Sequence, residues 1–178
     1  NITMELVGSS VPATEHSVMC AGGKDNELDT YRRLITQAYP KGVVSIVSDT
    51  WDLWNVLENH LPNLKSDILS RDGKVVIRPD SGDPVNILCG LRLGIDFDYY
   101  EGVPYNINLK KQDSFKYSEF EFLKLPLNES EQKGVIEILW DTFGGTINDK
   151  GYKELDPHIG AIYGDSITIN RAKQICER

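Results

Sequence analysis

Cysteine is scarce in this sequence, and the few that occur form no framework. Cys20, Cys89 and Cys176 are odd in number, far apart and never spaced as C-x-x-C. This pattern excludes a disulfide scaffold and a cysteine-based zinc site, because both need paired or closely spaced thiols. The cysteines therefore indicate reduced thiols, and we predict a cytoplasmic protein.

A surplus of basic residues and a long apolar run are also absent. Among the 178 residues, 27 are acidic and 19 are Lys or Arg, which gives a net charge of −8. A nucleic-acid-binding surface would be basic, so we expect no nucleic acid partner. No apolar run approaches the roughly 18 residues of a membrane span, so we expect no membrane insertion. Phosphorylated ligands are not excluded, because arginines, helix N-termini and bound Mg²⁺ supply positive charge locally.

An initiator methionine is lacking as well. The sequence opens at Asn1 in what reads as a strand end or loop, and it stops at Arg178 inside a stretch with helical character. We therefore expect the chain to be one segment of a longer polypeptide, with N-terminal and C-terminal parts outside it. Its length and its 40% hydrophobic content predict one globular core, so residues 1–178 are interpreted as a single fragment of one domain.

Strand and helix patterns alternate along the chain, which predicts an α/β fold with a parallel sheet. Each predicted strand ends in a polar turn. Three such units are too few to close an eight-stranded barrel, so the chain is interpreted as the central part of one. The predicted strands are 43–47, 74–77 and 159–163, and the predicted helices are 23–38, 51–60, 84–93, 130–143 and a final one. The predicted N-caps are Asp49 or Thr50, Asp83, Asn128 or Ser130, and Thr168 or Asn170.

Residues 95–127 differ from the rest of the chain. They are rich in aromatic and charged side chains and have no sustained helical period. The aromatic content argues against disorder. We interpret this segment as an insertion into the α/β pattern, with a small hairpin such as 115–125.

The octapeptide I-R-P-D-S-G-D-P at 77–84 carries the strongest chemical signal. It follows a β-branched strand, turns at Gly82, and enters a helix capped by Asp83 with proline at the first helical position. The turn presents Arg78 and Asp80 at the carboxyl end of a strand, where α/β proteins bind ligands. A cation beside carboxylates at such a place suits a phosphorylated, polyhydroxylated, metal-bound substrate. Taken alone, the same octapeptide also fits an ordinary solvated turn.

Polar turns at 10–16, 48–49, 78–82 and 164–166 should converge if the predicted strands are neighbours. Aspartates at strand ends suit Mg²⁺ bridged to phosphate, because Mg²⁺ takes one or two carboxylates and keeps substrate oxygens among its ligands. Carboxylates also accept hydrogen bonds from ribose hydroxyls. His16 is the only histidine inside one of these motifs, although a capping or packing role for it stays open.

Four motifs, in order, resemble the nicotinamide phosphoribosyltransferase family in its bacterial or phage form. The resemblance runs through nearly the whole chain. It implies an irregular α/β barrel of the type II phosphoribosyltransferase kind with an added domain, active as a homodimer. It also implies that nicotinamide and 5-phosphoribosyl 1-pyrophosphate give nicotinamide mononucleotide and pyrophosphate in NAD salvage. Mg²⁺ is implied as cofactor, and ATP as a co-substrate that acts through a phosphohistidine. The motifs are G-S-S-V-P-A-T-E-H-S at 8–17, V-V-S-I-V-S-D-T-W-D at 43–52, the octapeptide at 77–84, and I-Y-G-D-S-I at 162–167.

The resemblance implies a role for each matching residue. His16 would accept the phosphoryl group, and Asp49 and Asp80 would act in catalysis and at the metal. The implied substrate contacts are Ser10 and Val11 along the base tunnel, Ser45 on the strand facing the site, Arg78 at the base or the phosphorylated sugar, and Gly164 and Asp165 at the ribose.

Two other interpretations stay open beside a nicotinamide-specific enzyme. One is a nicotinate phosphoribosyltransferase, and the other is a non-catalytic remnant that only binds a phosphosugar. The aromatic residues that stack on the base in the family, and its glycine-rich phosphate loop, have no counterpart in this chain. We therefore expect the segment alone to be inactive.

Overall fold

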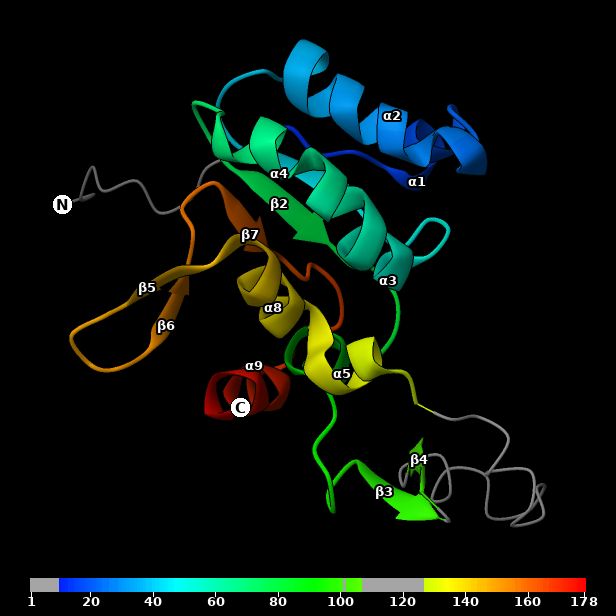
Figure 1. Cartoon of the computed structure of the whole chain (residues 1–178), viewed down its shortest axis with the longest axis vertical. Coiled ribbons are helices and arrows are strands. Elements are labelled where there is room, and N and C mark those ends of the chain that lie inside the picture. The colour runs from blue at the N-terminus through cyan, green and yellow to red at the C-terminus, as the bar shows by residue number, and fades with distance from the viewer. Residues whose placement is uncertain (1–9, 101, 107–126) are drawn as a thin grey trace, which may run out of the picture.

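The computed structural model describes residues 10–100, 102–106 and 127–178 of the chain. These residues form an α/β structure in which helices pack around a three-stranded parallel sheet (Figure 1). The α/β class and the parallel sheet predicted from the sequence are therefore confirmed. In the order in which they pair, the strands are β1 (Val44–Val47), β2 (Val75–Arg78) and β7 (Ile159–Ala161).

Parallel pairing places the carboxyl ends of these strands at one edge of the sheet. Val44 lies opposite Val75, which in turn lies opposite Ile159. A parallel bridge between Ala13 and Ser45 adds the segment before the first helix to the other side of β1. All four segments therefore run in the same direction. The edge at which they end is the one where open α/β sheets bind ligands.

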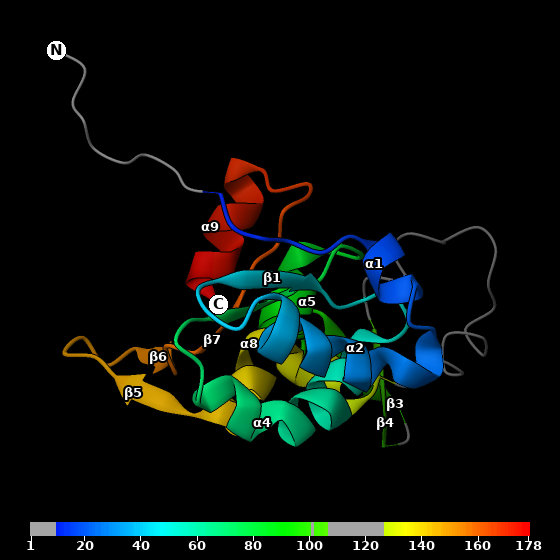
Figure 2. The same ribbon diagram turned by 90° about the horizontal axis from the view of Figure 1, so that it is seen from above.

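Helices cover the sheet. Figure 2 shows α2 and α4 on one side of β1 and α9 on the other. The predicted helix at 23–38 is found as a continuous run of η1, α2 and a π-helical turn, η2. The helical elements are α1 (His16–Cys20), η1 (Lys24–Asn26), α2 (Glu27–Arg33), η2 (Leu34–Ala38), α3 (Leu53–Asn55), η3 (Val56–His60), α4 (Leu61–Leu69), α5 (Pro84–Cys89), α8 (Glu129–Phe143) and α9 (Ile169–Glu177).

The core lies between the sheet and these helices. β1 is buried at each of its residues, as expected for a parallel strand covered on both faces. α4 buries Leu61, Leu64 and Ile68 completely, and their spacing places them on one face of the helix. Burial of each such aliphatic side chain contributes about 1.5–3 kcal/mol. This packing fixes the helix–sheet geometry that positions the polar turns.

The second predicted helix begins later and ends later than the sequence suggested. Its N-cap is Asp52, whose carboxylate accepts from the backbone amides of Trp54 and Asn55, so the prediction of Asp49 or Thr50 was wrong. The helix continues through the π-helical turn η3 into α4. Pro62 lies just after this π-helical turn, in the first turn of α4. Asp49 is thereby left free of a capping role.

The third predicted helix ends at Cys89 rather than near residue 93. Gly90 follows it with φ 73°, a conformation that favours glycine. A kink in α8 at Gly134, with φ 76°, packs directly against this end. A Cβ at Gly134 would lie 2.2 Å from the Gly90 nitrogen. The backbones of α5 and α8 therefore touch, and neither position has room for a side chain.

Two antiparallel hairpins are separate from the parallel sheet. β3 (Phe97–Tyr100) pairs antiparallel with β4 (Val103–Asn106), within the predicted insertion. The hairpin predicted at 115–125 lies outside the described residues, and the interpretation of 95–127 as an insertion stays a prediction. β5 (Gly145–Ile147) and β6 (Lys153–Leu155) form a second hairpin, in a part of the chain where no strand was predicted.

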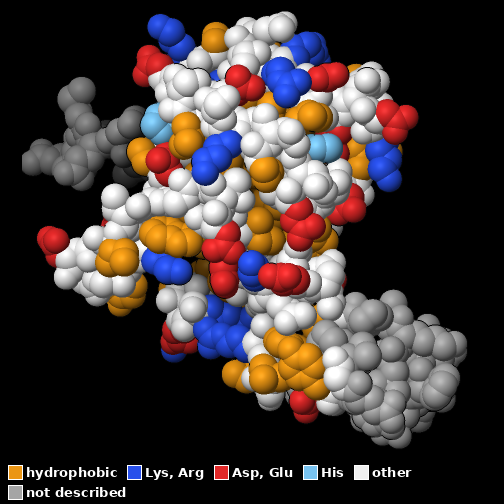
Figure 3. Space-filling view, viewed as in Figure 1, with side chains coloured by type: hydrophobic (Ala, Val, Ile, Leu, Met, Phe, Trp, Pro, Cys, Tyr) orange, Lys and Arg blue, Asp and Glu red, His pale blue; other side chains and the backbone are white. Residues whose placement is uncertain are grey.

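Apolar side chains are exposed over both hairpins, as the face in Figure 3 shows. Ile147 and Tyr152, on the second hairpin, are each 67% exposed, and Tyr99 on β3 is 49% exposed. Within the described ranges, none of the helices combines the length and the apolar character needed to cross a membrane.

Candidate active site at the carboxyl edge of the sheet

The turns that follow β1 and β2 are joined by hydrogen bonds. Ser48 N donates to Arg78 O at 3.0 Å, and Asp80 N donates to Asp49 Oδ2 at 2.8 Å. The other carboxylate oxygen of Asp49, Oδ1, is buried and has no hydrogen-bond partner among the described residues. A buried, unpaired carboxylate oxygen is costly unless a donor or a cation reaches it. Asp49 therefore has one oxygen that orders the turn and one oxygen still to be satisfied.

His16 lies at the start of α1, beside both turns. Its Nδ1 is 3.0 Å from Thr50 Oγ1, and its Nε2 is 3.5 Å from Asp80 Oδ2. The histidine side chain is nevertheless 44% exposed. The ring is thus held at both nitrogens while remaining open to a reagent from solvent. The structure brings together His16, Asp49 and Asp80, as the sequence predicted.

Arg78 ties the segment before α1 to the same edge. Its Nη2 donates to Thr14 O at 2.8 Å and lies 3.8 Å from Glu15 Oε2. Thr14 is itself fixed to β1, because its Oγ1 accepts from Val47 N at 2.9 Å. The Nε of Arg78 is buried and, within the described part of the chain, has no acceptor. The guanidinium of Arg78 therefore fixes the position of Thr14 and Glu15, the residues that lead into His16.

The other residues of the N-terminal motifs lie further along the sheet. Ser10 and Val11 are exposed and precede the bridge between Ala13 and Ser45. Since that bridge is parallel, both residues lie toward the amino end of β1, away from His16. Ser45 is buried in β1, and its Oγ lacks a hydrogen-bond partner among the residues described.

Gly164 and Asp165 follow β7 at the carboxyl edge. Ile162 N donates to Ile77 O at 3.0 Å, so pairing with β2 continues past the end of β7. A Cβ built at Gly164 would meet no atom within 4 Å, and Asp165 is exposed. Both positions are therefore accessible to a ligand that approaches the edge.

Tyr163, which the sequence analysis did not single out, lies at this edge just after β7. Its Oη donates to Gly82 O at 2.9 Å. Burial raises the pKa of Tyr163, and four nearby carboxylates raise this pKa further. The only sequence signal was its place between an apolar strand and a Gly-Asp turn. The four carboxylates, in order of their effect, are Asp49, Asp80, Asp165 and Asp83.

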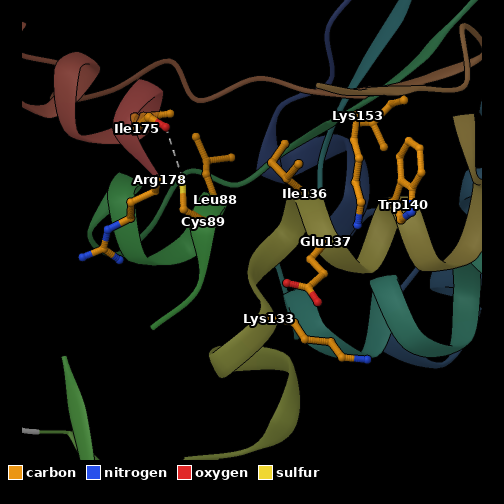
Figure 4. Close-up of a pocket in the computed structure, with 10 residues that line it drawn as sticks. Leu88, Cys89, Lys133, Ile136, Glu137, Trp140, Lys153, Ile175 and Arg178 are labelled. Carbon is orange, nitrogen blue, oxygen red and sulfur yellow. Dashed lines mark hydrogen bonds between the residues drawn. The ribbon is translucent and has the colours of Figure 1, made fainter. Parts of the chain in front are cut away.

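A hollow of about 390 Å³ lies elsewhere, between α5, α8, α9 and β6 (Figure 4). None of the predicted site residues lines it. The basic side chains around it are already engaged: Lys133 pairs with Glu129 and Asp141, Arg178 pairs with Asp96, and Lys153 lies 5.0 Å from the centre of the Trp140 ring. The carboxyl edge, rather than this hollow, is therefore the candidate active site.

A sequence model of the Nicotinate phosphoribosyltransferase (NAPRTase) family matches residues 1–178. The chain belongs to this family. It is similar to the nicotinamide phosphoribosyltransferase of Acinetobacter baylyi (strain ATCC 33305 / BD413 / ADP1), with 47% identity over 178 residues, 97% of this chain and 29% of that relative. The enzyme of the same name from Mycoplasma pneumoniae (strain ATCC 29342 / M129 / Subtype 1) is 36% identical over 97% of this chain and 31% of its own length. The NAPRTase-family chain thus spans less than a third of the length of these relatives.

The aspartates at this edge of the NAPRTase-family chain are the residues that could hold a Mg²⁺ ion. The amide of Asp80 is hydrogen-bonded to Asp49 Oδ2, and Asp49 Oδ1 is the oxygen that still lacks a partner among the described residues. In the described ranges, no cluster of three or more His, Cys, Asp or Glu side chains forms a complete metal cage. Mg²⁺ does not require one, because it binds through one or two carboxylates and completes its shell with water and substrate phosphate.

Proposed function

We propose that this chain is the central part of a nicotinamide phosphoribosyltransferase and that its sheet is an arc of a type II phosphoribosyltransferase barrel. The reaction joins the ring nitrogen of nicotinamide to the anomeric carbon of 5-phosphoribosyl 1-pyrophosphate. The carbon–oxygen bond to pyrophosphate breaks, and nicotinamide mononucleotide is released. One observation carries the proposal: Asp49 and Asp80 are hydrogen-bonded across neighbouring strand ends beside His16.

The residues of the edge suit each part of this reaction. The anomeric carbon gains positive charge as pyrophosphate leaves, and the carboxylates of Asp49 and Asp80 stabilise that charge. Asp165, beside the open backbone of Gly164, would accept a hydrogen bond from a ribose hydroxyl. Arg78 would contact the base or the phosphorylated sugar. Asp49 and Asp80 would hold Mg²⁺, which would neutralise charge on the departing pyrophosphate.

His16 is proposed as the site of ATP coupling. An imidazole nitrogen is a good nucleophile near neutral pH, and the exposure of this ring allows a nucleotide to reach it. A nitrogen–phosphorus bond forms while the terminal phosphorus–oxygen bond of ATP breaks, and ADP leaves. The contacts with Thr50 and Asp80 would fix the orientation of the ring during this step.

Nicotinate is the competing base, since the matching family is described by that substrate. The names of the relatives favour nicotinamide instead. Ser10, Val11 and Ser45 are proposed as lining for the base; because Ser10 and Val11 lie toward the amino end of β1, they would line a tunnel that runs along β1 to the carboxyl edge. We also propose that the whole enzyme is a cytoplasmic homodimer, because the resemblance of its motifs implies that assembly.

The test is product identification with the full-length protein. The protein is incubated with phosphoribosyl pyrophosphate, Mg²⁺ and either nicotinamide or nicotinate, with and without ATP, and products are identified by mass spectrometry. Nicotinamide mononucleotide, with less product from nicotinate, is the expected result. Preferential formation of nicotinate mononucleotide would move the assignment to the competing base. Absence of both mononucleotides, with retained binding of phosphoribosyl pyrophosphate, would support the non-catalytic alternative.

A further inference from the structure

We propose that Tyr163 and Arg171 are positioning residues that together clamp the turn carrying Asp80 to the loop carrying Asp165. We call these two contacts the edge clamp. The inference rests on the proposed function, because it assigns the clamp the task of holding the ribose-binding carboxylates at a fixed separation. Neither residue needs to touch the substrate.

The first contact of the edge clamp is the hydrogen bond from Tyr163 Oη to Gly82 O. Gly82 lies two residues after Asp80 and has φ 93°, a conformation open to glycine and strained for other residues. A Cβ at Gly82 would also crowd Ile87, at 3.1 Å. The ring of Tyr163 is half-buried against the core, and this packing fixes the position of its hydroxyl. The hydroxyl therefore holds a turn that contains glycine, the residue whose backbone is otherwise most free to change conformation.

The second contact comes from Arg171 in the first turn of α9. Its Nη1 donates to Ser166 O at 2.7 Å, and its Nη2 lies 3.5 Å from Asp83 Oδ2. The other oxygen of Asp83 caps α5 by accepting from the amides of Val85 and Asn86. Arg171 thus connects the loop after β7 to the cap that begins α5.

Ser166 supports this interpretation. Its φ of 55° is the one left-handed backbone conformation among the described residues other than glycine. Such a conformation costs on the order of 1 kcal/mol and persists where surrounding contacts impose it. The hydrogen bond from Arg171 is such a contact, and Asp165 is the adjacent residue. The loop is therefore held in a conformation that its sequence alone would not favour.

Electrostatics explains why a clamp is needed. Asp49, Asp80, Asp83 and Asp165 lie close enough to act together on Tyr163, and like charges gathered in this way repel one another. Without Mg²⁺ and substrate, that repulsion pushes the two loops apart. A tyrosine hydroxyl ordinarily has a pKa of about 10, and burial and these carboxylates raise the pKa of Tyr163 further, so the hydroxyl is a protonated donor at physiological pH. The edge clamp therefore opposes the repulsion before substrate arrives.

The test uses Tyr163→Phe and Arg171→Met in the full-length protein. Each should raise the KM for phosphoribosyl pyrophosphate about fivefold, the factor that corresponds to one lost net hydrogen bond, with little change in the KM for nicotinamide. Arg171→Lys should recover part of the loss, because it keeps a charge near Asp83. The double variant should lose less than the product of the single losses, because both contacts hold the same turn. Tyr152→Phe, on the exposed second hairpin, is the control and should change neither constant.

A second readout does not depend on activity. Hydrogen exchange at the amide of Asp80 and at its neighbours in the turn should accelerate about fivefold in Tyr163→Phe, and should not change in Tyr152→Phe. Unchanged exchange in both clamp variants would overturn the inference, as would equal effects on the KM values of both substrates. Accelerated exchange in a protein that forms no mononucleotide would instead sustain the clamp and reject the proposed function.

Discussion

The amide of Asp80 donates a 2.8 Å hydrogen bond to Asp49 Oδ2, although the two residues are 31 positions apart in the sequence. The bond joins the ends of two parallel strands and uses one carboxylate oxygen to shape the turn that carries the second carboxylate. The side chain of Asp49 thus accepts a hydrogen bond that shapes the turn and carries the charge proposed to act in catalysis. Substitutions that remove one of these properties and keep the other are the most informative.

Asp49→Asn should separate charge from turn geometry. The asparagine oxygen can still accept from the Asp80 amide, so the thermal transition of the full-length protein should remain close to that of the wild type. The rate of nicotinamide mononucleotide formation should fall about 100-fold, because the charge that stabilises the reacting carbon is lost. Asp49→Ala should lower both the rate and the melting temperature. Full activity in Asp49→Asn would show that the carboxylate charge is not used.

His16→Ala should uncouple ATP from transfer. ATP hydrolysis and the stimulation of product formation by ATP should disappear, whereas slow transfer without ATP should remain, because Asp49 and Asp80 are unchanged. Asp80→Ala should damage transfer in both conditions. The measurement compares ADP release and mononucleotide formation in the same samples. Undiminished ATP hydrolysis in His16→Ala would show that His16 does not accept the phosphoryl group and would favour a packing or capping role.

Glu27 should make stability depend on pH. It is 2% exposed, its Oε2 lies 3.3 Å from His60 Nε2, and its Oε1 has no hydrogen-bond partner among the described residues. Burial raises the pKa of Glu27 to about 7 and lowers the pKa of His60, so both groups favour their neutral forms. Between the unfolded pKa of 4.5 and the folded pKa, the folded state holds the extra proton. The contribution of Glu27 to stability therefore falls as pH rises through this window.

Glu27→Gln isolates this effect, because His60 is common to both proteins. The free energy of unfolding of the variant, relative to that of the wild type, should increase by about 3 kcal/mol between pH 4.5 and pH 8, with most of the change below pH 7. Urea unfolding of the full-length protein at several pH values provides the measurement. A difference that stays constant across this range would mean that Glu27 is already ionised in the folded state.

Gly134→Ala should disrupt the contact between α5 and α8. The new Cβ would lie 2.2 Å from the Gly90 nitrogen, on a backbone with φ 76°. The crowding and the strained backbone together should lower the free energy of unfolding by about 3 kcal/mol. Gly151→Ala is a matched control, with φ 82° and no atom within 4 Å of the new Cβ, and should cost only about 1 kcal/mol. Equal losses in the two variants would contradict the close approach of the two helices.

Local sequence signals determined the parts of the fold that depend on neighbouring residues. The N-caps at Asp83, Asn128 and Thr168 were among those predicted, because a capping side chain acts on amides two or three positions ahead. The three strands of the parallel sheet were placed within about two residues by their β-branched runs. The polar turns were likewise placed at one edge, because parallel strands leave their carboxyl ends together.

Contacts between distant segments were decided by the tertiary structure alone. Gly90, within 84–93, is a local signal for the end of α5, but its close approach to Gly134 appears only in the tertiary structure. Asp52, and not Asp49, caps the helix that begins at Leu53. Asp49 instead accepts a hydrogen bond from the amide of Asp80, in the turn after β2. The bond from Tyr163 to Gly82 spans 81 positions, and a tyrosine before a Gly-Asp turn is ordinary until the sheet brings the two loops together. The sequence by itself determined which chemical groups reach the carboxyl edge, whereas packing over long separations determined which of them touch.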